Sequence, residues 1–242
     1  MRQSITWVGA AVLIVACGVP QAPRLQMSGA VAAESDAAAA QPSHLERTAV
    51  EEMLFGSKGQ WQHWTAAPDL VVLTSVMEYE APDATEYTAT SELLKAEDMQ
   101  ELVVDLIAAL RILTNNTFEQ FAHVEYASVP AGSKASIVRQ KQIVVGRYRG
   151  VRSLTHTLGF GGRRTRPDGT IFGAAVVLDS EFDRTSEMRR LLRTHELGHA
   201  LGYNHVESRA SIMNPRIGAE MTDFDRQIVR AAFQDQAEKV SQ

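Results

Sequence analysis

The chain has 242 residues, of which 45% are hydrophobic and 22% are charged, and its formal net charge is −5. This composition is ordinary for a soluble globular protein with one domain and additions, or with two small domains. A chain with a net negative charge does not generate the positive potential that attracts the phosphate groups of nucleic acids. The composition therefore argues against nucleic acid binding. With one cysteine, a disulfide framework is excluded.

The N-terminus has the pattern of an export signal. Arg2 precedes an apolar run from Ile5 to Ala16 that is interrupted only by Thr6 and Gly9. The run has the length of a signal-peptide core and is too short to cross a bilayer as a helix. We therefore expect residues 1–16 to be a signal peptide.

Cys17 closes the tetrapeptide Ile14–Cys17 (Ile-Val-Ala-Cys). This tetrapeptide resembles the lipobox of bacterial lipoproteins, in which cleavage before the cysteine leaves it as a lipid-modified N-terminus. The resemblance implies an exported protein, anchored to a membrane of the bacterial cell envelope by acyl chains on Cys17. Gly18 is not the aspartate associated with inner-membrane retention, so the outer membrane is favoured in a cell that has one. The alternative is an ordinary secretory signal with Cys17 incidental.

The next segment is rich in Ala, Gln, Pro and Ser as far as about residue 43, and it buries too little apolar surface to order itself. His44 to Phe55 has a short helical pattern, which Gly56 and Gly59 interrupt. We assign residues 17–60 to the lipidated cysteine and a flexible tether, or to a propeptide-like segment. Residues 61–242 are then the folded domain.

Hydrophobic patterns predict several regular elements along this domain. Strands are expected where β-branched and apolar residues alternate or run together, and one long helix is expected where leucines recur at i, i+3 and i+4. The strands are predicted at 70–77, 121–129, 137–145 and 171–179, and the long helix from Ser91 to Leu113.

A second helix is predicted from about Asp183 to Gly202. The stretch Asp183–Glu187 would supply its N-cap and an acidic first turn. It carries His195 and His199, which four-residue spacing places on one face, one turn apart. Two neutral imidazoles so placed are able to hold one Zn²⁺ at roughly 2.0–2.1 Å.

Three further residues complete a candidate metal site. Glu196 adjoins the first ligand and is the candidate base for a metal-bound water. Gly202 is able to end the helix with positive φ and to turn the chain so that His205 approaches the ion. Three protein ligands and one open position describe a catalytic zinc site with a single ion.

The run from His195 to His205 resembles the metzincin zinc endopeptidases, whose signature is H-E-x-x-H-x-x-G-x-x-H followed by a methionine turn. Met213 lies in Ser211–Pro215 (Ser-Ile-Met-Asn-Pro), and its eight-residue distance from His205 is similar to the matrixin branch. The resemblance implies that Met213 forms a hydrophobic floor under the metal without ligating it. It also implies an α+β, zincin-like fold: a twisted mixed sheet with an edge strand over the site, a long helix, the zinc-binding helix and a C-terminal helix.

The same resemblance assigns the substrate-binding edge strand to Ser153–Gly162, followed by a basic loop from Arg163 to Gly169. By position, Leu158, Gly159 and Phe160 would pair with an extended substrate backbone. The alternative is a glycine-rich connection without a substrate role.

The resemblance has one departure near the specificity pocket. Pro215 and Ile217 stand where many metzincins and matrixins have tyrosines, so an apolar pocket wall including Ile217 is the expectation. A last helix should start after Met221, capped by Thr222 or Asp223.

These features predict a monomeric zinc-dependent endopeptidase that acts on peptide or protein substrates, with Glu196 as general base. A zinc-binding surface lipoprotein without catalysis is one alternative. A peptidase specialised for cell-wall peptides is another.

Overall fold

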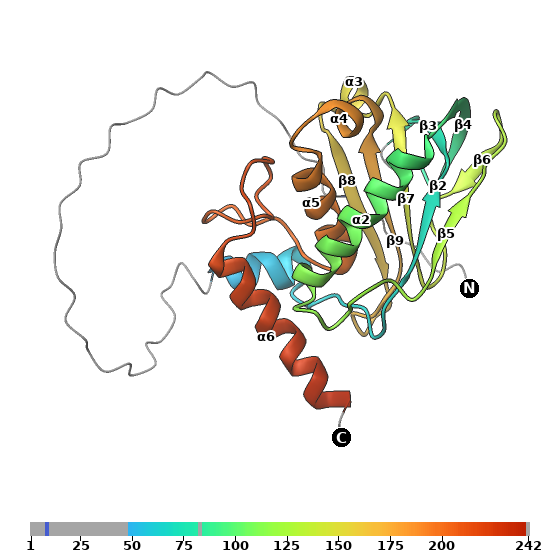
Figure 1. Ribbon diagram of the computed structural model, residues 1–242. Coiled ribbons are helices and arrows are strands. Elements are labelled where there is room, and N and C mark those ends of the chain that lie inside the picture. Colours follow the sequence, from blue (N-terminus) through green and yellow to red (C-terminus); the bar gives the residue numbers. More distant parts are fainter. Residues whose placement is uncertain (1–7, 10–47, 82–83, 241–242) are drawn as a thin grey trace, which may run out of the picture.

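The computed structural model describes residues 8–9, 48–81 and 84–240, with side chains of the last helix described as far as Phe233. The expected signal peptide (apart from Val8–Gly9), Cys17 and the predicted tether 18–43 lie outside the described residues. Helices α2 and α5 pack against one face of a curled mixed sheet, and α6 extends away from it (Figure 1). The α+β class expected from the sequence is confirmed.

The strands are β1 Val8–Gly9, β2 Asp69–Leu73, β3 Ser75–Glu78, β4 Glu86–Leu93, β5 Val124–Ala127, β6 Lys134–Ser136, β7 Gln142–Arg149, β8 Gly159–Thr165 and β9 Ile171–Asp179. The helices are the π-helical turn η1 Glu51–Phe55, the 3-10 turn η2 Gly56–Lys58, α2 Ala96–Leu113, α3 Val151–Thr155, α4 Ser180–Thr185, α5 Arg189–Leu201 and α6 Asp223–Val240. Within the described ranges, none of the helices is both long and apolar enough to cross a membrane.

The centre of the sheet is parallel, and the outer strands are antiparallel except for β5. Strand β7 pairs in parallel with β9 on one side, and on the other side with β2 along its first half and β3 at its end. Strand β5 extends the sheet beyond β2, and β4 and β6 extend it beyond β3. Strand β8 runs antiparallel to β9, and its other side pairs only with the two residues of β1 among the described residues.

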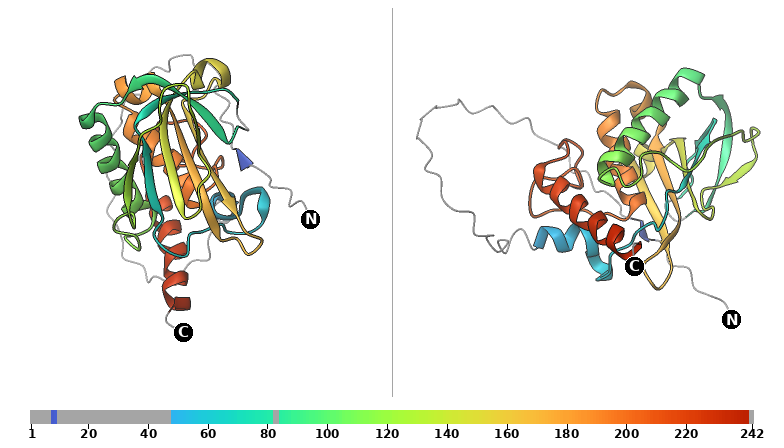
Figure 2. Two further views of the ribbon diagram at one scale, coloured as in Figure 1. Left: turned by 90° about the vertical axis from the view of Figure 1, so that its right-hand side faces the viewer. Right: turned by 60° about the horizontal axis from the view of Figure 1, so that its bottom comes forward.

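Both faces of the central strands are buried, which explains their continuous apolar sequences. On β2, Leu70 and Val72 face the helices, while Val71 and Leu73 belong to a second core that contains Tyr87 and other tyrosines. The curled strands β3, β4 and β6 cover this second face (Figure 2). The sheet therefore has a helical layer on one side and its own curled end on the other.

The predicted long helix exists, but its predicted start at Ser91 is wrong. Strand β4 continues to Leu93, which pairs with Ser75, and the next residue donates its N–H to the carbonyl of Thr74 at 2.8 Å. These sheet hydrogen bonds hold the first leucines of the pattern, so α2 begins only at Ala96.

The helix predicted from Asp183 to Gly202 is two helices. Asp179 caps α4 by accepting the N–H of Phe182 at 3.0 Å, and the extended backbone of Ser186 separates α4 from α5. The N-cap and acidic first turn expected within Asp183–Glu187 are therefore wrong: Met188 is the N-cap of α5, and no acidic residue lies in its first turn. Asp183 is instead fully buried, and its carboxylate accepts from two arginines.

The strand predicted at Ser153–Gly162 is also misplaced. Positive φ angles at Gly150 (91°) and His156 (59°) enclose the short helix α3, and the strand begins at Gly159. It continues to Thr165, so the start of the predicted basic loop at Arg163 belongs to β8.

The packed unit begins before residue 61. Thr48–Lys58 is helical, and Ala49, Met53 and Leu54 join the core on the helical side of the sheet. Residues 48–58 therefore pack on the domain.

A buried ion network connects α5 to the rest of the fold. Asp183 accepts from Arg193 of α5 at 2.7 Å and from Arg147 of β7 at 2.7 Å, and all three side chains are at most 1% exposed. Arg193 also reaches Asp105 of α2 at 2.7 Å. Because the guanidinium groups are buried, solvent does not replace a lost partner. The Asp183 carboxylate therefore holds α5 at Arg193, two residues before His195.

We predict that Asp183→Asn destabilises the protein by about 3–5 kcal/mol, because it leaves two buried cations poorly compensated. Glu78→Gln is the control, because its pair with Arg149 is about half exposed and contributes less than about 1 kcal/mol. Urea unfolding monitored by circular dichroism measures both values. Equal stability losses in the two variants would contradict this account of the network.

Candidate metal centre

Three histidine rings converge at one point beside the sheet. The Nε2 atom of His199 lies 3.1 Å from that of His195 and 3.0 Å from that of His205, and the remaining pair is 3.3 Å apart. In the described chain, these three residues form a group close enough to bind a metal ion. The expected convergence of His205 with the other two histidines is therefore confirmed.

The distances fit one divalent ion. Ligand nitrogens at 2.0–2.1 Å from a tetrahedral centre are separated by about 3.3 Å, which is close to the observed spacings. Three nitrogens then occupy three corners and leave the fourth open.

Hydrogen bonds fix which ring nitrogens are free. Nδ1 of His195 lies 2.8 Å from the carbonyl of Ile212, and Nδ1 of His199 lies 2.9 Å from the carbonyl of Tyr203. A carbonyl only accepts, so each neutral ring carries its proton on Nδ1 and turns an unprotonated Nε2 toward the other. Facing lone pairs repel each other, and a cation between them removes that repulsion.

Burial keeps the three rings neutral. It lowers the pKa of His195 below its usual value, and lowers that of His199 further with the help of the neighbouring histidines. Burial and the charge of His195 lower the pKa of His205 to about 4. Neutral imidazoles are the form that binds metals.

The end of α5 brings the third histidine into place. Helix α5 ends at Leu201, Gly202 follows with φ 121°, and the N–H of Tyr203 donates to the carbonyl of Gly198 at 3.0 Å. A Cβ at Gly202 would overlap the carbonyl oxygen of Gln62. The position therefore favours glycine for both its φ and its lack of a side chain, and the predicted helix end is confirmed.

Glu196 lies under β8 with an unused oxygen. The side chain is 1% exposed, Oε2 has no hydrogen-bond partner among the described residues, and the carboxylate interacts with the backbone of Gly161. Burial raises its pKa to about 8, against the lowering effect of the Gly161 hydrogen bond. A buried acceptor without a partner, next to three metal-type ligands, fits a bound ion with its water.

Met213 packs under the metal helix. It is fully buried, and a Cβ at Gly198 would lie 2.6 Å from its sulfur atom. Its carbonyl accepts the N–H of Val206, so the turn also holds the chain just after His205. This is the position expected for Met213.

Sequence reasoning missed Asp225 of α6, which holds the methionine turn. Its buried carboxylate accepts from Ser211 Oγ and, at 3.0 Å, from the N–H of Ile212, the residue whose carbonyl binds His195. It also accepts from the N–H of Thr222 at 2.8 Å, while Thr222 Oγ1 accepts from the N–H of Asp225 at 3.2 Å. Thr222 is thus the predicted cap of α6, and the reciprocal pair was the available signal for Asp225.

Arg163 was also missed, because it was assigned to an exposed loop. Its side chain is 7% exposed and donates to the carbonyls of His199 at 2.8 Å and Tyr203 at 3.2 Å. Burial lowers its pKa to about 10. A cation at the C-terminal end of α5 complements the helix dipole and binds carbonyls that lack helical partners.

The residues expected to bind substrate lie on different sides of the sheet. A Cβ at Gly159 would lie 3.3 Å from Glu196 Cγ, so this residue adjoins the site, with half-buried Leu158 before it. Phe160 lies on the opposite face, its ring 5.2 Å from that of Tyr79. Ile217 is half-buried against the core of the helical side.

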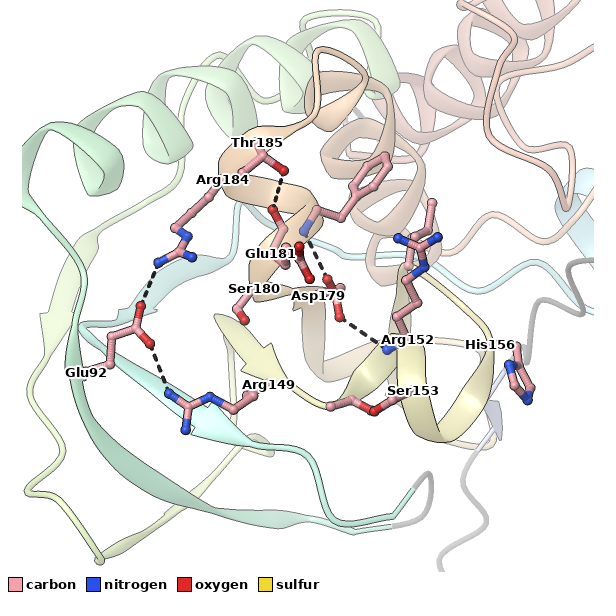
Figure 3. A pocket seen from close by; sticks show the side chains of 13 residues that line it. Glu92, Arg149, Arg152, Ser153, His156, Asp179, Ser180, Glu181, Arg184 and Thr185 are labelled. Carbon is pink, nitrogen blue, oxygen red and sulfur yellow. Dashed lines mark hydrogen bonds and ion pairs between the residues drawn. The ribbon is translucent and has the colours of Figure 1, made fainter.

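A second hollow of about 1070 Å³ lies between α3, α4 and the end of β7 (Figure 3). Glu92 joins Arg149 and Arg184 within it, and Asp179 accepts the N–H groups of Arg152 and Phe182. Of the described residues that line this hollow, none has a buried side-chain N or O atom without a hydrogen-bond partner, in contrast to Glu196.

Metal binding should expel a proton from Glu196. At pH 7 a carboxyl with a pKa of about 8 is roughly nine-tenths protonated, and a nearby divalent cation favours its ionised form. We predict that zinc binding at pH 7 releases about one more proton in the wild type than in Glu196→Gln. Titration calorimetry in two buffers of different ionisation heat measures this difference, and equal proton release would contradict the assignment.

No protein-family model matches the chain, and no curated protein matches it at a significant level. The geometry of the three histidines and Glu196 therefore carries the functional argument.

Proposed function

We propose that the chain is a zinc-dependent endopeptidase of the metzincin type, closest to the matrixin branch. The observation that carries the proposal is the convergence of three Nε2 atoms beside the unpaired oxygen of buried Glu196. Three neutral imidazoles with an open fourth position are a ligand set of catalytic zinc. The order of α2, β8, β9, α5, the methionine turn and α6 also supports a metzincin-like fold.

The residues of the chain supply orientation and proton transfer. A zinc ion held by the three histidines would lower the pKa of its water and polarise the scissile carbonyl. Glu196 accepts a proton from the attacking water through its free Oε2 and later donates it to the leaving amine. Its interaction with Gly161 fixes the carboxylate against β8 and holds it in position.

The outer side of β8 is suited to a peptide backbone. Val8 and Gly9 pair antiparallel with Arg163 and Gly162, so this side accepts an extended segment. A substrate would add to β8 in the same way, through backbone N–H and C=O groups. Leu158 and Gly159 would contact it near Glu196, Phe160 would contribute only backbone, and Ile217 would form part of a pocket wall.

The proposal extends to the N-terminus. Export with cleavage before Cys17 would remove residues 1–16, including Val8 and Gly9, and leave the outer side of β8 free. Acyl chains on Cys17 would then hold the enzyme at a membrane of the cell envelope.

Glu196→Gln should keep zinc and lose peptide cleavage. The amide is close in size to the carboxylate but does not accept the proton, and general bases contribute on the order of 10²–10⁴ in rate. Zinc content and kcat/KM on a casein-like substrate or a peptide library measure the two effects. Glu187→Gln, an exposed carboxylate before α5, serves as the control and should match the wild type.

Two results would contradict the proposal. Unchanged turnover in Glu196→Gln would remove this residue from the mechanism. A zinc-loaded wild type that cuts neither casein-like substrates nor library peptides would favour a binding lipoprotein instead.

A further inference from the structure

His205 is supported differently from the other two candidate ligands. His195 and His199 lie on α5, whereas the backbone at residues 203–207 forms neither helix nor strand. A ligand on such a loop has more conformational freedom to lose on binding than one on a helix. Contacts that hold the loop therefore bear directly on the metal site.

The segment 48–58 contacts this loop on both sides of His205. The carbonyl of Met53 accepts the backbone N–H of Asn204 at 2.8 Å and its side-chain Nδ2 at 3.2 Å. On the other side, Glu52 Oε2 accepts the N–H groups of Glu207 at 3.0 Å and Ser208 at 3.2 Å, and Ser208 Oγ at 2.8 Å. Two consecutive residues thus hold the positions before and after the third ligand.

The segment is itself firmly placed. Ala49 and Met53 are fully buried in the helical-side core, and the segment lies beside the loops that follow α5 (Figure 1). Gly56 has φ 49°, and a Cβ there would lie 2.8 Å from Asn204 Cγ. The close approach of the segment to the Asn204 side chain thus depends on this glycine.

The side chain of Asn204 forms hydrogen bonds both to the segment 48–58 and to strand β8. Its Oδ1 accepts from Arg163 of β8 at 2.8 Å while its Nδ2 donates to Met53. The residue before His205 is therefore held from β8 and from the segment together.

We propose that residues 48–58 position His205 for metal binding, with Glu52 as the positioning residue. The inference rests on the metal centre of the proposed function and deepens it. A carboxylate that accepts three donors makes charge-assisted hydrogen bonds, which are the stronger kind, and it restrains the loop where it leaves His205. The segment would thus support the metal site from outside the helix that carries the other two ligands.

The test is zinc affinity of the full chain, measured by competition with a chelator. Glu52→Ala should weaken zinc binding about tenfold, as expected when support of a metal ligand is lost. Glu52→Gln keeps an acceptor oxygen without the charge and should weaken it about threefold. Glu51→Ala is the matched control, because Glu51 is the exposed neighbour, and it should bind zinc as the wild type does.

The absorption spectrum of the Co²⁺-loaded protein reports the ligand set. It should change in Glu52→Ala, because His205 is less firmly held, and remain unchanged in Glu51→Ala. Wild-type zinc affinity in Glu52→Ala, or an equal loss in Glu51→Ala, would overturn the proposal.

If Glu52→Ala unfolds without metal, Glu52→Gln decides the question. Weaker zinc binding at unchanged stability of the metal-free protein supports the proposal, and unchanged binding overturns it. Peptide cleavage plays no part in these readouts, so a failure of the peptidase proposal is recognised separately.

Discussion

The structure depends on holding three ring nitrogens about 3 Å apart, of which those of His195 and His199 are unprotonated. The observed spacings are 3.0–3.3 Å, and the hydrogen bonds on Nδ1 of His195 and His199 turn lone pairs inward. Without a cation, this arrangement is repulsive and buries polar groups at a cost. The surrounding fold must therefore hold it in place.

Each side of the centre is restrained by buried polar groups from distant parts of the chain. Asp183 fixes the start of α5 through Arg193, Arg163 binds carbonyls at its end, and Asp225 holds the methionine turn. Glu52 adds the restraint beyond His205. All three carboxylates and Arg163 come from elements outside the metal motif, as expected where several layers position one site.

The sequence alone predicted the local part of the site. The spacing of His195 and His199 and the stop at Gly202 follow from helix periodicity and glycine conformation, which depend on neighbouring residues only. The resemblance added Met213, which packs against Gly198 of α5, and its role as a floor under a metal stays a prediction. The resemblance also implied the α+β class, which the structure has.

The remaining features depend on contacts that no local pattern reveals. Leu93 fits the helical stripe of α2, but its pairing with Ser75 places it in a strand. Asp183 looks like a helix cap, but two arginines from other elements bury it. Arg163 lies in a basic stretch that looks like a loop in the sequence. Only the pairing of β8 with β9 places it so that its side chain binds the carbonyl of His199 at the end of α5.

The most direct test of the central claim is zinc K-edge X-ray absorption on the purified full chain loaded with one equivalent of zinc. The account predicts three imidazole nitrogens and one further light atom at about 2.0–2.1 Å around a four-coordinate ion. A zinc ion with fewer than three imidazole ligands, or one surrounded mainly by oxygen, would contradict it.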